Sequence, residues 1–158
     1  MKKRKPRSKK ENWTRALLSF SPCSEKLRFY RKFKTIREAW AGIEDSSDVD
    51  WIAARFLPTE QYTKYAKLKY RLEDKVEKTA AYKKLNEKYD RHYDYMYEER
   101  CKGTTKKDKL TPKQVKAVLK AMDMMMVKAY KEAFYQVSKK RYPTKEMIAS
   151  AIAFRNNY

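Results

Sequence analysis

Three tyrosines spaced four residues apart form the pattern in this sequence that comes closest to a catalytic site: Tyr89, Tyr93 and Tyr97. Tyrosines one turn apart share a face of a helix, and a phenolate can attack a phosphodiester when a metal ion polarises the phosphate. Such a metal is usually held by a pair of histidines, and His92 is the only histidine in the chain. We therefore interpret the tyrosines as packing residues, and the sequence predicts that the protein is not an enzyme.

The sequence predicts no metal site and no cofactor. Cys23 and Cys101 lack the spacing of zinc ligands, and we expect both to be reduced. Asp90 and Asp94 flank His92, but residues two apart on a helix do not face each other. The two glycines stand far apart, so no Gly-rich phosphate-binding loop is present.

The charge of the chain predicts a polyanionic partner. Lys and Arg number 40 against 20 Asp and Glu, which gives a formal net charge of +20. This excess repels itself unless a polyanion neutralises it, so nucleic acid, either DNA or RNA, is the partner that we expect. A protein partner or a second copy of the chain is the alternative. No apolar run approaches the ~18 residues of a membrane span, and the basic N-terminus lacks the apolar region of a secretory signal, so we expect a cytoplasmic protein without a membrane partner.

Two basic parts of the chain are the predicted binding elements. Residues 1–10 contain seven basic residues and no acid, which predicts a disordered arm. Residues 2–7 also fit a nuclear-import pattern, a less specific interpretation. Lys and Arg bind phosphates by releasing counterions and do not read the base sequence in doing so. The residues expected to bind are Lys2, Lys3, Arg4, Lys5, Arg7, Lys9, Lys10, Arg28, Arg31, Lys32 and Lys34, with Lys139, Lys140 and Arg141 as a second patch.

Exposed aromatic rings would add stacking on unpaired bases. Five tyrosines lie at the edge of the apolar stripes or outside them, and some of them are candidates for this role: Tyr30, Tyr62, Tyr70, Tyr95 and Tyr158.

The elements that position these residues are predicted to be helices. We expect helices over residues 11–20 and 23–34, and residues 59–102 contain neither Gly nor Pro. That stretch permits one very long helix, although its apolar stripe changes phase near Thr79, which would suit a kink. Thr111, Pro112 and Gln114 predict the start of a helix that ends near residues 139–141, and a last helix follows Pro143. The predicted fold is all-α: a basic arm (1–10), a small helical subdomain (11–58), and a long antiparallel helical pair with a short C-terminal helix (59–158).

A short helical hairpin anchored by Trp40 and Trp51 is predicted within the subdomain. Thr35 and Glu38 fit a capping box at its first helix, and residues 47–50 are predicted to cap its second. Residues 38–60 carry six acids and one base, so the second helix would present carboxylates where a DNA-reading helix needs cations. We interpret the hairpin as a packing unit or as a docking site for a basic surface.

The hairpin resembles one found in small phage and bacterial proteins that mostly lack an assigned activity. The resemblance rests on Ala39-Trp40, an acidic turn, and Asp48-x-x-Trp51-Ile52-Ala53, and it covers residues 38–53 only. The Cys that usually precedes the turn and a further Trp after the Asp are missing. The resemblance implies a phage or mobile-element origin and a structural role for both tryptophans. Together these patterns predict a non-catalytic nucleic-acid-binding or nucleoprotein-assembly protein; the alternative is a helical interaction protein that forms a homo-oligomer, a virion component or a clamp on a host protein.

Overall fold

The computed structural model describes residues 23–97 and 103–156, and every regular element in these ranges is a helix, which confirms the predicted all-α class. None of these helices combines the length and the apolar character that crossing a membrane requires. The predicted arm and the predicted helix over residues 11–20 lie outside the described residues. The elements are α2 (Ser24–Arg31), α3 (Ile36–Ala41), α4 (Ser46–Phe56), α5 (Thr59–Glu77), α6 (Ala80–Tyr97), the short 3-10 helix η1 (Lys106–Asp108), α7 (Pro112–Ser138) and α8 (Lys145–Asn156).

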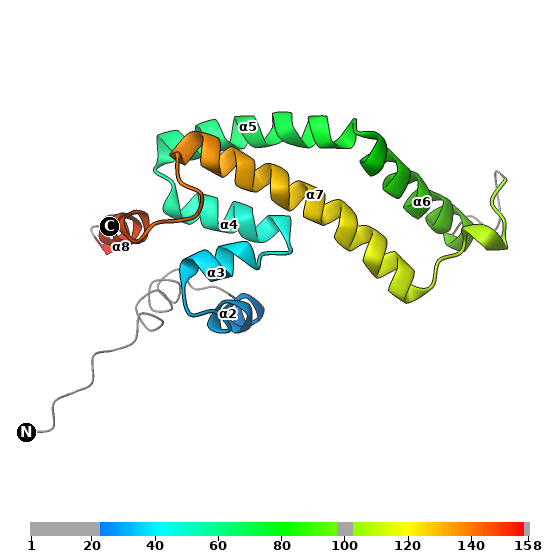
Figure 1. Ribbon diagram of the computed structural model, residues 1–158, viewed down its shortest axis with the longest axis horizontal. Helices are drawn as coiled ribbons and strands as arrows, with labels where there is room; N and C mark the ends of the chain where they lie inside the picture. The colour runs from blue at the N-terminus through cyan, green and yellow to red at the C-terminus, as the bar shows by residue number, and fades with distance from the viewer. Residues whose placement is uncertain (1–22, 98–102, 157–158) are drawn as a thin grey trace, which may run out of the picture.

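Helix α7 is the element on which the other long helices pack. Its 27 residues span about 40 Å at the usual rise of an α-helix. The chain runs outward through α5 and α6 and returns through α7, and α4, α5 and α6 all contact α7 (Figure 1). This arrangement contains the antiparallel long pair that the sequence predicts.

The predicted long stretch over residues 59–102, which packs along α7, contains two helices, α5 and α6, and not one. Helix α5 ends at Glu77, and the hydroxyl of Thr79 donates to the carbonyl oxygen of Val76 at 2.6 Å. The same hydroxyl accepts the N–H of Tyr82 at 3.3 Å, in the first turn of α6. One side chain therefore binds backbone groups at the end of α5 and at the start of α6, as a capping residue does. Of the two arrangements that the sequence left open, the kinked one is present.

Helix α3 begins where its capping residues predict. The hydroxyl of Thr35 accepts the N–H of Glu38 at 3.2 Å. The carboxylate of Glu38 accepts the N–H of Lys34 at 3.0 Å, one residue before the predicted partner. Both side chains thus satisfy backbone donors that precede or open the helix.

The predicted cap of α4 at residues 47–50 is wrong, because the helix begins earlier. Asp45 is the N-cap residue and accepts the N–H of Ser47 at 2.8 Å. The N–H and the hydroxyl of Ser46 donate to the carboxylate of Asp123 in α7, at 3.1 and 2.6 Å. Asp45 is a capping residue in the local sequence that the prediction passed over, and the contact with Asp123 joins the first turn of α4 to α7.

The helices after residue 103 follow their predicted boundaries. Thr111 and Gln114 exchange both hydrogen bonds of the capping box, at 3.2 and 2.9 Å. Helix α7 ends at Ser138, and Lys139 adopts the left-handed conformation with a φ of 59°. The hydroxyl of Thr144 accepts a backbone N–H from the first turn of α8 at 3.2 Å.

One hydrophobic core is shared by α2, α3, α4, α5, α7 and α8, whereas α6 contributes no buried residue. Burying a large apolar side chain stabilises a fold by about 1.5–3 kcal/mol. The apolar residues of the hairpin that lie in the core are Ile36, Ala39, Trp40, Ile43, Val49, Ile52, Ala53 and Phe56. Residues on both sides of residue 58 contribute to this core. The predicted division of the chain at residue 58 stays a prediction. Members of the core include Tyr30, Trp40, Ile43, Ile52, Phe56, Tyr65, Val127, Tyr130, Phe134 and Ile148.

The two tryptophans join the hairpin to neighbouring helices. Trp40 is 5% exposed, and its ring centroid lies 4.8 Å from that of Phe134 in α7. Trp51 is half-buried and stacks on Tyr30 of α2 at 6.3 Å. Each ring thus contacts an aromatic residue of a different helix, a contact typically worth about 0.5–1.5 kcal/mol beyond the area that it buries.

Candidate nucleic-acid interface

The carboxylates at the start of α4 are paired with lysines of the protein's own helices. Lys26 of α2 forms an ion pair with Asp48, and Lys69 of α5 forms one with Asp50 at 2.7 Å. The acidic hairpin was interpreted as a packing unit or as a docking site for a basic surface. In the structure it packs within the fold, and helices α2 and α5 supply cations to it.

Asp50 is at the centre of a largely buried polar network between α4, α5 and α7. It accepts a hydrogen bond from the hydroxyl of Tyr65 at 2.8 Å as well as the one from Lys69. The ammonium of Lys69 lies 5.1 Å from the ring centroid of Tyr130, whose hydroxyl donates to Glu73. Burial disfavours the charged form of Lys69, but the hydrogen bond and the charge of Asp50 outweigh it, so the pKa of Lys69 lies above its usual range. The network fastens the hairpin to the long helices.

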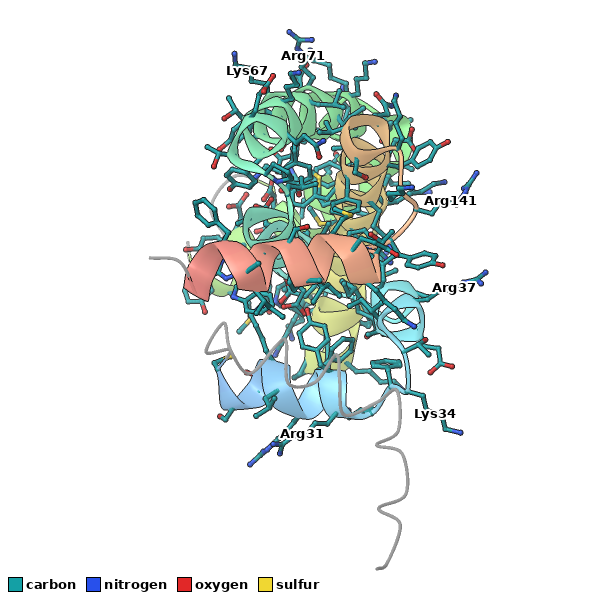
Figure 2. The ribbon with its side chains drawn as sticks, turned by 90° about the vertical axis from the view of Figure 1, so that its left-hand side faces the viewer. Arg31, Lys34, Arg37, Lys67, Arg71 and Arg141 are labelled. Carbon is teal, nitrogen blue, oxygen red and sulfur yellow. The ribbon has the colours of Figure 1, made fainter. Side chains whose placement is uncertain are left out.

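Three exposed basic side chains project to one side of the molecule. Figure 2 shows Arg141 and Arg37 projecting to the same side, with Lys34 below them. Lys67 and Arg71 of α5 project from the upper end of the same view. We name Lys34, Arg37 and Arg141 the basic edge.

The basic edge connects two segments that the sequence predicted separately. The guanidinium of Arg37, at the start of α3, lies 5.7 Å from the ring centroid of Tyr142, in the turn after α7. Arg37 was not among the predicted binding residues, although its place beside the inward-facing Ile36 in a predicted helix could have indicated that it is exposed. The predicted residues that the structure describes are all exposed: Arg28, Arg31, Lys32, Lys34, Lys139, Lys140 and Arg141. Lys2, Lys3, Arg4, Lys5, Arg7, Lys9 and Lys10 lie outside the described residues.

The tyrosines proposed for base stacking differ widely in exposure. Tyr30 of α2 was among these candidates, and its predicted exposure is wrong. Its side chain is 0% exposed, because it packs in the core against Trp51 of α4. Tyr70 is 65% exposed, and Tyr62 and Tyr95 are half-buried. Tyr158 lies outside the described residues.

The residues that come closest to a catalytic pattern have structural contacts. The rings of Tyr93 and Tyr97 lie 4.6 Å apart on the exposed side of α6, and Tyr89 is half-buried. The Nδ1 atom of His92 accepts the N–H of Leu110 at 2.8 Å, which ties α6 to the segment before α7. Within residues 23–97 and 103–156, no group of three His, Cys, Asp or Glu residues is placed to hold a metal ion.

Comparisons of the chain with models of protein families, with curated proteins and with solved structures give no match. Function is therefore inferred from the charge and the geometry of the residues described above.

Proposed function

We propose that this protein is a non-catalytic nucleic-acid-binding protein of a nucleoprotein assembly. It binds the phosphate backbone of DNA or RNA through the basic edge and the exposed cations beside it, without reading the base sequence. We extend the proposal to a phage or mobile-element origin, which the resemblance of residues 38–53 implies.

The observation that carries the proposal is the separation of paired from unpaired charge. Asp48 and Asp50 are covered by lysines of the same chain. Arg37 and Arg141 contact aromatic rings and form no ion pair with a carboxylate in the part of the chain that the structure describes. A polyanion that approaches this side meets three exposed cations, and each phosphate that it places on a cation releases a counterion.

Salt titration of a basic-edge variant tests the proposal. Replacing Lys34, Arg37 and Arg141 together by Gln removes three positive charges from one side of the molecule. We expect weaker binding to short DNA and RNA, and a slope of log Kd against log salt that is smaller by about two to three.

The matched control replaces Lys67, Arg71 and Lys75 of α5 by Gln. These three residues are exposed, and their replacement removes the same number of positive charges. We expect this control to change the affinity and the slope less than the basic-edge variant does. Equal effects of the two variants would show that net charge, and not the basic edge, governs binding. Binding by the unmodified protein that does not respond to salt would refute the proposal itself.

A second candidate function, assembly through the helices, is favoured by a separate observation. Tyr93, Met96 and Tyr97 of α6 are 48, 48 and 71% exposed, and Leu119 of α7 is 43% exposed. Exposed apolar residues that gather on one part of a surface often mark an interface with another protein or a second copy. Light scattering at low and high salt distinguishes this candidate, because apolar association persists at high salt and phosphate binding does not.

A further inference from the structure

An open pocket lies between α3 and α7, next to the basic edge. Its volume is about 590 Å³, within the range of small-ligand pockets, and Arg141 belongs both to its rim and to the basic edge. Trp40 of α3 and Val127 of α7 form an apolar floor, with Met124 beside them. We name this the α3–α7 pocket.

Two cations of the pocket each contact an aromatic ring. The guanidinium of Arg141 lies 5.1 Å from the ring centroid of Tyr135, and the ammonium of Lys131 lies 5.6 Å from that of Trp40. Lys128 adds a third cation to the lining. A ligand in this pocket therefore meets flat apolar surface and positive charge within a few ångströms of each other.

Lys131 is the group in the pocket that most needs an anion. It is half-buried and forms no ion pair within the described residues, and burial lowers the pKa of its ammonium. Glu132 also lines the pocket, but it is exposed, and its carboxylate accepts a hydrogen bond from the amide of Gln136 at 2.9 Å, one turn along α7. A bound phosphate would supply the ion-pair partner that Lys131 does not have within the described residues.

The combination of an apolar floor with cations at the rim fits one unpaired nucleotide better than a base pair. An unpaired base has a flat face that stacks on aromatic or guanidinium planes, and its phosphate lies at the outer side of the base. In a duplex the bases are stacked on each other, so only phosphates could reach the pocket and its floor would stay empty.

We propose that the α3–α7 pocket binds one nucleotide of a single-stranded nucleic acid, with the base against Tyr135 and the apolar floor and a phosphate beside Lys131 and Arg141. This inference rests on the proposed function and adds to it a preference for single strands, in which the neighbouring phosphates follow the basic edge.

The test uses full-length protein and three probes of equal phosphate number: a single-stranded oligothymidine, an abasic oligomer and a blunt duplex. We expect the oligothymidine to bind more tightly than the other two. The Tyr135→Ala substitution should weaken oligothymidine binding roughly 5- to 150-fold, the range for one stacked base, and should leave abasic binding unchanged. Lys131→Gln should weaken binding of both single strands and lower the salt slope by about one.

Tyr97→Ala is the matched control. Tyr97 is a tyrosine of α6 that is 71% exposed, and its ring contacts that of Tyr93, outside the pocket and outside the set of tyrosines proposed for base stacking. This substitution should not change the ratio of oligothymidine to abasic affinity. Circular dichroism of each variant confirms that the helices are intact.

Three outcomes would overturn the inference. If Tyr135→Ala affects the oligothymidine and the abasic oligomer alike, the base does not enter the pocket, and the proposed function still stands on the salt dependence. If the unmodified protein binds none of the three probes, the proposed function fails as well. If a glutamate-rich peptide of equal charge binds more tightly than the oligothymidine and Tyr135→Ala weakens that binding, the pocket belongs to an acidic protein partner.

Discussion

Asp50 shows how one carboxylate can connect two helices. Its two oxygens accept hydrogen bonds from Tyr65 at 2.8 Å and from Lys69 at 2.7 Å, both on α5. Lys69 is 9% exposed, and Tyr65 is 0% exposed. A buried ion pair adds little stability compared with apolar residues, but removing one partner leaves a desolvated charge unpaired.

We therefore expect Asp50→Ala to lower the free energy of unfolding by about 3 kcal/mol, the lower end of the range for buried pairs, because Asp50 itself is partly exposed. Urea denaturation measures this change. The control is Asp74→Ala, whose ion pair with Lys78 is exposed at both ends and should contribute less than about 1 kcal/mol. Similar losses in the two variants would show that the Asp50 pair is no stronger than a surface pair.

At the scale of the elements, the bend between α5 and α6 decides how much of α7 is covered. Two straight helices that cross at an angle diverge beyond their crossing point. Because the chain bends at Lys78 and Thr79, α6 contacts α7 as α5 does (Figure 1). The bend also gives α6 an exposed outer side, where Tyr93 and Tyr97 lie.

Thr79→Ala should destabilise the protein by about 1 kcal/mol, the typical loss for a capping side chain, and should speed hydrogen exchange of the first amides of α6. The matched control is Thr63→Ala in α5. The hydroxyl of Thr63 donates to the carbonyl of Thr59, four residues back in the same helix, and a bond of this kind adds no stability. If both substitutions have the same effect, the hydroxyl of Thr79 does not hold the bend.

At the scale of the whole molecule, the core contains groups that must stay protonated. Burial raises the pKa of Tyr30, Tyr65 and Tyr130, and the nearby carboxylates Asp48, Asp50 and Glu73 respectively raise it further. The unfolded tyrosines titrate near their ordinary pKa of 10.0, so above that pH the unfolded state loses protons that the folded state keeps. Stability from these groups is fully present below their unfolded pKa and is lost as the pH rises towards the folded values.

At neutral pH these tyrosines are protonated in both states, so we expect their titration to leave the free energy of unfolding unchanged there. Once the pH exceeds about 10, we expect the free energy of unfolding to fall. Lys69, whose pKa is also raised, contributes in the same direction at slightly higher pH. Urea denaturation across this range measures the fall, and the last part of the phenolate absorbance, which belongs to the buried tyrosines, should appear together with the loss of helix. Absorbance that rises to completion while the helices remain would contradict the prediction.

The sequence by itself determined the helices and most of their ends. Few glycines and regular apolar spacing predicted an all-α fold, and Thr35 and Thr111 marked helix starts correctly. These features are predictable because a capping hydrogen bond joins residues within three or four positions, so the chain's own geometry fixes it. The cations predicted to bind nucleic acid are exposed wherever the structure describes them, and their binding stays a prediction.

Only the tertiary structure decided which distant side chains meet. Asp123 binds Ser46, which is 77 positions away in the sequence, and this contact joins the first turn of α4 to α7. Tyr30 is buried because α2 docks on the hairpin, and Arg37 lies on Tyr142 because α3 packs beside the end of α7. The α3–α7 pocket likewise exists only where these two helices cross. Such contacts depend on how six helices share one core, and no short stretch of sequence specifies that packing.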